Sequence, residues 1–340
     1  MKKKIWTAAL AALAIFVSFG CNGGGAATAN NGNPQGKRFK IGVSIPAADH
    51  GWTAGVNWWA KQAKELYPNV DWVIDDAKSP DEQIADLQNM QSQGVDALVI
   101  LCTESAPITP IAKKLHDAGI MIVNVDRGFT EPVADVFIEG DNKSFGRKSA
   151  EYVAERMGGT WDKDHTTLSG AHGNLVILRG ISCTVDDDRF NAGMAVFRKN
   201  PKINIVSVQR GEWNRETADK AMQNILTANP KIDAIWAQDD DMALGAENAL
   251  KAAGREGEVW MLGGAGMKDI VKRVMDGDKM FPADITYPPS MIAQGMAQAV
   301  SILQVGKDKA LQFVPKHMML DVDLITPDNA QKYYFPDSIY

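Results

Sequence analysis

The sequence predicts an α/β protein made of two doubly wound parallel-sheet lobes that are joined by a three-strand hinge. Short apolar runs alternate with helical segments along the body of the chain, which is the pattern of a parallel sheet covered by helices on both faces. The alternation starts a second time near residue 141, so we expect two similar lobes in place of one large sheet. Later segments return to the first lobe, and several crossings make a hinge that bends without letting the lobes separate.

The first series of β-α units predicts five strands and three helices. The strands are expected at residues 40–45, 70–74, 97–101, 121–125 and 136–139, and the helices at 52–66, from 79 onward and at 108–118. The helix after Ser79 has a well-marked start, because an N-cap serine is followed by Pro80 in the first turn and by Glu82 as a capping glutamate.

The second series follows the join at Gly140-Asp141-Asn142. Its helices are expected at 143–157, 189–199, 215–228 and 241–253, and its strands at 175–178, 203–208, 234–237 and 259–262. A long helix at 290–305 then follows Tyr287-Pro288-Pro289, and an alternating strand is expected at 317–324. We therefore predict crossings near residues 141, 287 and 316. The first lobe would hold 38–140 and 288–316, and the second lobe 141–287 and 317–340.

The N-terminal segment has the pattern of an export signal. Three lysines at positions 2–4 precede an apolar run from 5 to 19 that is short for a membrane span. Cys21 follows Gly20 directly, which resembles a bacterial lipoprotein signal of residues 1–21 with a lipidated cysteine. The alternative is cleavage near Ala26-Ala27, which would release a soluble protein. Residues 22–37 are rich in Gly, Asn and Ala and are expected to be a flexible tether.

Composition excludes several classes of protein. The 340 residues carry a net charge of −6 without a Lys/Arg-rich arm, so a nucleic-acid partner is not expected. Beyond Cys21 the chain has only Cys102 and Cys183, which are expected to be buried packing residues and not a disulfide pair. No CxxC or HExxH motif occurs, so neither a metal nor another cofactor is expected.

The segment Met121–Phe129 carries the most informative side chains. An apolar run ends on Asp126-Arg127, and a glycine then turns the chain. Ligands of open parallel sheets bind outside the carboxyl ends of the strands. A carboxylate beside a guanidinium at that place can accept and donate hydrogen bonds to one small polyhydroxyl molecule. The alternative is an ion pair on the surface.

Taken together, these residues resemble the periplasmic sugar-binding proteins of ABC importers, of the ribose/galactose/xylose type (type I periplasmic binding proteins). The resemblance extends over residues 39–324. It rests on Asp126-Arg127, on Gly140-Asp141-Asn142 before a helix, and on the run 237–245, AQDDDMALG, which is close to the family's AQNDxMALG. The runs 49–52, DHGW, and 222–226, MQNIL, also fit. The resemblance implies two α/β lobes that close on a sugar and carry out no reaction.

The resemblance also implies a set of ligand-binding residues. They are His50, Trp52, Thr103, Glu104, Asp126, Arg127, Asp188 or Arg189, Trp213, Asp239 and Tyr287. This chain departs from the ribose binders after the strand expected at 259–262. It has Gly263-Gly264-Ala265-Gly266 where they have an aromatic residue and an aspartate, so ribose itself is in doubt.

Other interpretations of these side chains remain open at this stage. Trp52 and Trp213 can stack on a sugar ring or belong to the core, where we expect Trp58 and Trp59. His50 can bind a hydroxyl group or lie in an exposed loop. The runs 186–188 and 239–241 are each three aspartates, which could suggest calcium, but neither has the spacing of a calcium loop. Helix caps and ligand acceptors are the favoured roles.

We expect an extracytoplasmic solute-binding protein that captures a monosaccharide (a pentose or hexose) or a polyol by closure of two lobes. Its expected partners are an ABC permease and, through lipid on Cys21, the membrane, and the expected state is a monomer. One alternative is a sugar receptor that feeds chemotaxis, and another is a glycoside-processing enzyme with paired carboxylates. The sensor core of a lac-repressor-type regulator shares the fold, but such proteins begin with a DNA-binding domain.

Overall fold

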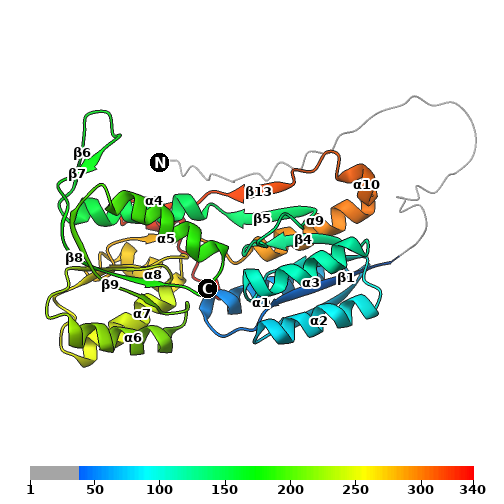
Figure 1. Ribbon diagram of the computed structural model, residues 1–340, viewed down its shortest axis with the longest axis horizontal. Coiled ribbons are helices and arrows are strands. Elements are labelled where there is room, and N and C mark those ends of the chain that lie inside the picture. Colours follow the sequence, from blue (N-terminus) through cyan, green and yellow to red (C-terminus); the bar gives the residue numbers. More distant parts are fainter. Residues whose placement is uncertain (1–37) are drawn as a thin grey trace, which may run out of the picture. The chain divides into compact units, whose positions relative to one another are not determined.

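The computed structural model describes residues 38–340, which form one compact unit (Figure 1). The predicted signal, the tether and the proposed lipidation site Cys21 lie outside the described residues. Within residues 38–340, no helix is long and apolar enough to cross a membrane.

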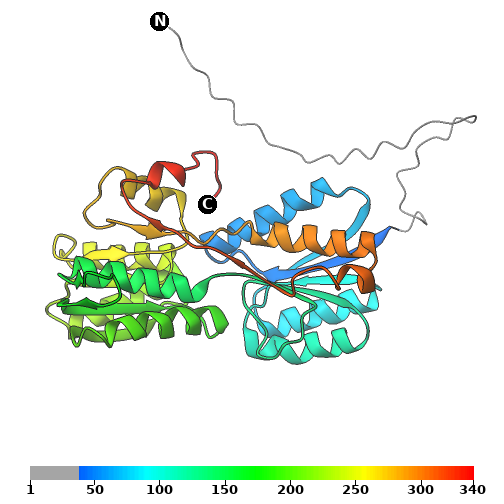
Figure 2. The ribbon, with the colours of Figure 1, turned by 90° about the horizontal axis from the view of Figure 1, so that it is seen from above.

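The first sheet contains six parallel strands in the order β13-β5-β4-β3-β1-β2. The strands are β1 (Phe39–Pro46), β2 (Val70–Ala77), β3 (Ala97–Ile100), β4 (Met121–Val125), β5 (Val136–Gly140) and β13 (His317–Leu320). The helices are α1 (Gly51–Leu66), α2 (Pro80–Ser92), α3 (Ser105–Asp117) and α9 (Met291–Val305). α1 and α9 pack together on one face, and α2 and α3 on the other (Figure 2). We call this part the first lobe.

The second sheet contains four parallel strands in the order β11-β10-β8-β9. The strands are β8 (His172–Arg179), β9 (Lys202–Arg210), β10 (Ala234–Ala237) and β11 (Trp260–Leu262). The helices are α4 (Asn142–Arg156), α5 (Thr184–Phe197), α6 (Arg215–Ala228), α7 (Asp240–Ala252) and α8 (Lys268–Met275). α4 packs against α5, and α6 against α7. We call this part the second lobe.

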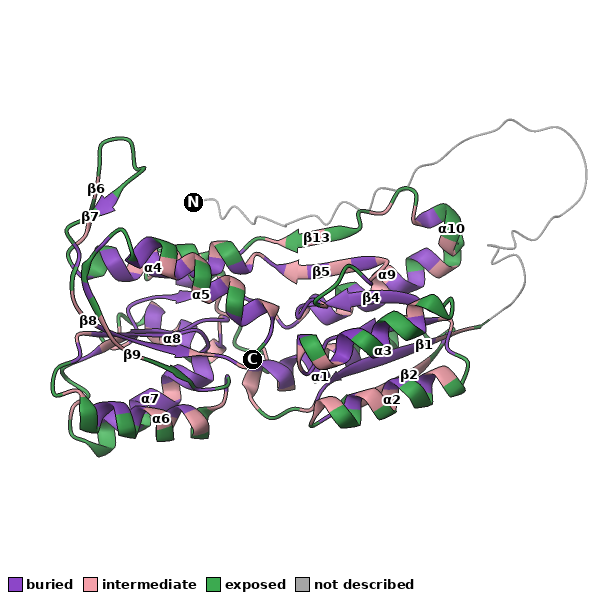
Figure 3. Cartoon of the chain, in the orientation of Figure 1, coloured by how far each residue is buried: buried purple, intermediate pink, exposed green. Residues whose placement is uncertain are grey.

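Small elements complete the described chain. β6 (Thr160–Trp161) and β7 (Leu168–Ser169) form a hairpin, and β12 (Asp284–Ile285) pairs antiparallel with β14 (Leu324–Ile325). The short helices α10 (Lys307–Ala310) and η1 (Ala330–Lys332) lie near the C-terminal end. Strongly apolar strands form the core, and every residue of β3, β4 and β10 is buried (Figure 3).

The α/β class and the parallel sheets are confirmed, while one predicted boundary is wrong. We expected residues from 317 onward to belong to the second lobe, but β13 pairs in parallel with β5 and is an edge strand of the first sheet. The chain joins the second lobe only after Leu320, since β14 pairs with β12. Alternation of apolar and polar residues predicts that one face of a strand is buried, but it does not predict which sheet the strand joins.

Helix starts follow the local signals in the sequence. The Ser79 side chain accepts a hydrogen bond from the backbone N–H of Glu82, and the Glu82 carboxylate accepts one from the N–H of Lys78. Asp141, Asn214 and Asp239 cap α4, α6 and α7 in the same way. These caps fix the helix ends that face the region between the lobes.

Candidate functional site

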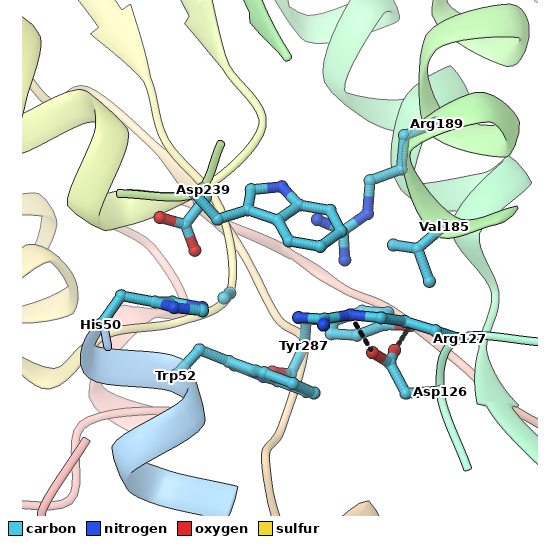
Figure 4. A pocket seen from close by; sticks show the side chains of 10 residues that line it. His50, Trp52, Asp126, Arg127, Val185, Arg189, Asp239 and Tyr287 are labelled. Atoms are coloured by element: carbon cyan, nitrogen blue, oxygen red, sulfur yellow. Dashed lines mark hydrogen bonds and ion pairs between the residues drawn. The ribbon is translucent and has the colours of Figure 1, made fainter. Parts of the chain in front are cut away.

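A cavity of about 270 Å³ lies between the two lobes (Figure 4). Residues from both lobes and from the connecting segments line it: His50, Trp52, Asp126, Arg127, Val185, Arg189, Trp213, Asp239, Ala265 and Tyr287. We call it the inner cavity. Charged, polar and aromatic side chains of both lobes face this space, so one molecule placed there would contact both lobes.

Asp126 and Arg127 form a buried pair directly after β4. Each is only 2% exposed, and Asp126 Oδ2 lies 3.7 Å from Arg127 Nε. Arg127 Nη1 donates to the backbone carbonyls of Cys102 and Thr103, at 3.0 Å each. Asp126 has φ = +64°, a left-handed conformation that non-glycine residues adopt at a cost and that is common at functional sites. A surface ion pair is therefore ruled out for these residues.

Tyr287 connects the two lobes at the wall of the inner cavity. Its hydroxyl donates to Asp126 Oδ1 at 2.5 Å and accepts from Asn142 Nδ2 at 3.1 Å. Trp52 Nε1 donates to the carbonyl of Tyr287 at 2.9 Å, and the two rings lie 6.0 Å apart. Glycine at position 140 makes room for this ring, because a Cβ there would lie 2.2 Å from Tyr287 Cε2.

Arg189 reaches the inner cavity from α5 of the second lobe. Its Nε donates to Asn142 Oδ1 at 3.0 Å, and its Nη1 donates to the carbonyl of Gln238 at 2.9 Å. The guanidinium also lies 4.3 Å above the ring of Tyr287 and 3.8 Å above that of Phe145. Hydrogen bonds and cation–π contacts together fix the orientation of this charged group.

Trp213 faces Arg127 from the second lobe. The Arg127 guanidinium lies 4.9 Å from the centre of the Trp213 ring, and Trp213 is 5% exposed. Glu212 and Trp213 both have φ = +57°, so the chain turns sharply to deliver the indole. Glycine at position 180 permits the packing, because a Cβ there would lie 2.0 Å from Trp213 Cε2.

The carboxylates at the inner cavity sit in an unusual electrostatic environment. Burial raises the pKa of Asp239 to about 7, although the nearby His50 opposes the shift. Asp239 Oδ1 accepts the backbone N–H of Met242 and so caps α7. Burial also raises the pKa of Asp126, against the effect of the Arg127 and Arg189 charges. His50 Nδ1 lies 2.6 Å from the carboxylate of Asp49.

The inner cavity presents polar groups that can form hydrogen bonds to one ligand. Among the described residues, Arg127 Nε has no hydrogen-bond partner although it is buried, and an unsatisfied buried donor costs roughly 1–3 kcal/mol. A ligand oxygen would remove that cost. Carboxylates supply acceptors, guanidinium groups supply donors, and the indoles of Trp52 and Trp213 offer flat apolar faces.

Eight of the eleven predicted residues line the inner cavity, and three do not. Thr103 and Glu104 line an adjoining cavity. Asp188 lies outside both cavities, with its side chain 39% exposed and 4.0 Å from Lys143 Nζ. Successive residues of a helix point about 100° apart, so Asp188 points away where its neighbour Arg189 points inward. Sequence reasoning missed Val185, which carries no polar signal, and it did not include Ala265 among the site residues.

Two further expectations can be compared with the structure. Trp58 is 36% exposed, so placing it in the core was wrong, whereas Trp59 is partly buried and packs against the core. The two packed cysteines are as expected, since Cys102 and Cys183 are both buried and free.

Three aspartates of the two runs serve structural roles. Asp186 pairs with Arg179 and Arg210, Asp240 accepts the N–H groups of Gly264 and Met267, and Asp241 pairs with Arg215. Within residues 38–340, no group of three or more His, Cys, Asp or Glu side chains is arranged to hold a metal ion.

Two parallel sheets with a small cavity between them match the two-lobe architecture of the solute-binding proteins. The family model of the periplasmic binding protein domain matches residues 41–308, and the chain belongs to this family. Its members are substrate-binding proteins, not enzymes, and they work outside the cytoplasm.

Several relatives have described ligands. The chain is 30% identical over 255 residues to the D-ribose/D-allose-binding protein of Pseudomonas aeruginosa, which covers 73% of this chain and 76% of that protein. It is 28% identical over 242 residues to the xylitol-binding protein of Mycolicibacterium smegmatis, covering 70% and 65%. Among solved structures, it is similar to the fructose-binding periplasmic domain of a hybrid two-component system, with a TM-score of 0.76, 28% identity and coverage of 87% and 93%.

Proposed function

We propose that the protein captures a monosaccharide or a related polyol outside the cytoplasm and delivers it to an ABC permease. The observation that carries the proposal is the inner cavity itself, where the buried Asp126-Arg127 pair and two indoles lie around a space for one small molecule. The ligands in the names of the ribose/allose and xylitol relatives support this choice of class.

The proposed ligand would be held by two kinds of contact. Trp52 and Trp213 would pack on its C–H faces, and Asp126, Arg127, Arg189 and Asp239 would bind its hydroxyl groups. Tyr287 and His50 would complete the wall. Micromolar affinity requires about −8 kcal/mol, which several charge-assisted hydrogen bonds and two stacked rings can supply.

Capture would proceed by closure of the two lobes about the connecting segments. We propose lobe boundaries close to those expected from the sequence, with the last crossing moved to follow Leu320. A ligand that contacts both lobes stabilises the closed form by the free energy of its additional contacts. The bonds that join the lobes here, such as that between Gly51 N and Asp241 Oδ2 at 2.7 Å, would contribute to the closed form.

We further propose that the protein is a lipoprotein, anchored to the membrane through lipid on Cys21 after removal of the signal, and that it functions as a monomer. The basic and apolar pattern before Cys21 supports this localisation. Mass spectrometry of the membrane fraction would test it, because an acylated N-terminal Cys21 peptide is expected. A mature chain that begins near Ala26 would contradict it.

A sensory role is the second candidate. The similar fructose-binding domain belongs to a two-component system, so a captured sugar could be reported to a receptor in place of a permease. Deletion of the binding protein would separate the roles, since uptake of the ligand is lost only if the protein serves import.

A thermal-shift assay with pentoses, hexoses and polyols tests the proposed ligand class. At least one of these compounds is expected to raise the melting temperature, because a ligand that binds only the native state stabilises it. Amino acids and nucleosides serve as negative controls. Failure of every sugar and polyol to shift the melting temperature would contradict the proposal.

A further inference from the structure

A second cavity adjoins the inner one and is larger. Its volume is about 610 Å³, and its wall includes Asp49, Lys78 and Glu104 of the first lobe and Ile181 and Glu212 of the second. We call it the outer cavity. His50, Arg127 and Trp213 line both cavities, so these three side chains form the boundary between them.

Three of the charged side chains that line the outer cavity have no protein partner. Among the described residues, no hydrogen bond or ion pair engages the side chains of Lys78, Glu104 or Glu212. Glu104 precedes the first residue of α3, yet its carboxylate does not cap the helix. Glu212 is exposed and is held at φ = +57° beside Trp213. Two carboxylates and an ammonium group therefore lie free at the edge of an open space.

The two free carboxylates lie close to side chains that line the inner cavity. A non-glycine residue with positive φ carries a conformational cost, and Glu212 adopts such a conformation. The conformation at Glu212 places its neighbour Trp213 at the boundary of the two cavities, and Glu104 follows Thr103, whose carbonyl is bound by Arg127. Both free carboxylates are thus attached to residues that fix the inner cavity.

We infer that the outer cavity is a subsite for a second sugar unit, so that the ligand is a disaccharide or another glycoside whose terminal ring enters the inner cavity. The inference rests on the proposed function of the inner cavity. The terminal ring would lie in the inner cavity, and the attached unit would extend past His50, Arg127 and Trp213 into the outer cavity. Glu104 and Glu212 would accept hydrogen bonds from its hydroxyl groups, and Lys78 would donate one.

Isothermal titration with matched pairs of probes tests the subsite. The pairs are D-fructose and sucrose, D-xylose and xylobiose, D-galactose and lactose, and myo-inositol and galactinol. At least one glycoside is expected to bind about tenfold more tightly than its single-ring partner, because it gains charge-assisted hydrogen bonds in the outer cavity.

A double variant, Glu104→Ala with Glu212→Ala, assigns the gain to the outer cavity. The dissociation constant of the glycoside is expected to rise at least about tenfold, while that of the single-ring partner stays within about twofold because neither glutamate side chain lines the inner cavity. Glu65→Ala with Glu256→Ala is the matched control, since both glutamates are exposed and lie outside the walls of the two cavities. The control is expected to bind both probes as the native protein does.

The outcomes separate the subsite from the function on which it rests. Binding of single-ring probes with no binding of any glycoside would overturn the subsite and leave sugar capture intact. Equal weakening of both members of a pair by the double variant would also overturn it. No binding of either kind of probe would overturn the proposed function and the subsite with it.

Discussion

Arg127 is the residue on which the geometry of the inner cavity depends most. Its planar guanidinium donates to two backbone carbonyls, lies beside Asp126 and stacks against Trp213 at the same time. A lysine ammonium is a point charge that cannot reproduce a planar fork. The identity of this side chain, and not only its charge, is therefore expected to matter.

We predict that Arg127→Lys weakens binding of the sugar that gives the largest thermal shift by at least about tenfold. The reason is the loss of one or more charge-assisted hydrogen bonds, each contributing about 1.5–3 kcal/mol. Isothermal titration measures the change. Arg198→Lys is the control, since Arg198 is exposed and lies away from the inner cavity. Unchanged affinity of the Arg127 variant would show that its guanidinium does not contact the ligand.

Asp239 makes stability depend on pH. Burial raises its pKa from 3.8 to about 7 in the folded chain, so the folded state binds this proton more tightly than the unfolded state does. The contribution of protonated Asp239 to the unfolding free energy is fully present below about pH 4 and is lost as the pH rises to about 7. Between pH 5 and 8 this single group is expected to remove about 3 kcal/mol of unfolding free energy.

We predict that Asp239→Asn loses less stability between pH 5 and pH 8 than the native protein. Asparagine keeps the cap of α7 but does not titrate. Urea unfolding at the two pH values gives the comparison, with Asp337→Asn as an exposed control. Identical pH dependence in native and Asp239→Asn proteins would contradict the raised pKa.

At the scale of residues, much of the candidate site could be predicted from the sequence. Polar residues that follow strands, such as Asp126 and Arg127, are identified by the strand pattern and by the family motif together. Val185 could not be predicted, because an apolar residue in the first turn of a helix resembles any core residue. Asp188 and Arg189 could not be distinguished, because the start of α5 lies five residues earlier than the pattern suggested.

At the scale of elements, two glycines position the aromatic wall of the inner cavity. Gly140 ends β5 against the Tyr287 ring, and Gly180 follows β8 against the Trp213 indole. In each case the backbone lies so close to the ring that no side chain fits. The strands thus fix the rings through close contact of backbone and aromatic atoms.

We predict that Gly180→Ala weakens sugar binding by about tenfold or more. The added Cβ would displace the Trp213 indole. Loss of the packing of this indole on the sugar ring costs on the order of 1 kcal/mol or more. Isothermal titration measures the loss. Gly257→Ala is the matched control, because a Cβ at position 257 would meet no atom within 4 Å. A Gly180 variant with native affinity would mean that Trp213 does not take part in binding.

Element types and order could be predicted well, but pairing across the lobes could not. β4, α6 and β10 have the expected bounds. Exposed and partly buried residues alternate along β13, and this pattern suits an edge of either sheet. Tertiary contacts decide its parallel pairing with β5. α8 was missed, because its eight residues follow a glycine-rich turn and give too short a pattern.

At the scale of the whole described unit, direct hydrogen bonds join the lobes around the inner cavity. Gly51 N donates to Asp241 Oδ2 at 2.7 Å, and Gly128 N donates to Thr184 Oγ1 at 2.9 Å. These bonds form only when the lobes are close, so they add to the stability of the closed form that the ligand selects.

We predict that Asp241→Ala shifts the protein toward the open form and raises the ligand dissociation constant by about tenfold, mainly through faster dissociation. Stopped-flow kinetics measures the rates, and small-angle X-ray scattering measures the change in radius of gyration. Asp276→Ala is the control, since Asp276 pairs with Lys272 within one helix turn of the second lobe. An unchanged dissociation rate would show that this bond plays no part in closure.

A crystal structure with the most strongly stabilising sugar or glycoside tests the central claim most directly. We expect density for one ring in the inner cavity, stacked on Trp52 or Trp213 and hydrogen-bonded to Asp126 and Arg127. A saturated crystal whose ligand lies elsewhere, with the inner cavity closed to it, would contradict the account.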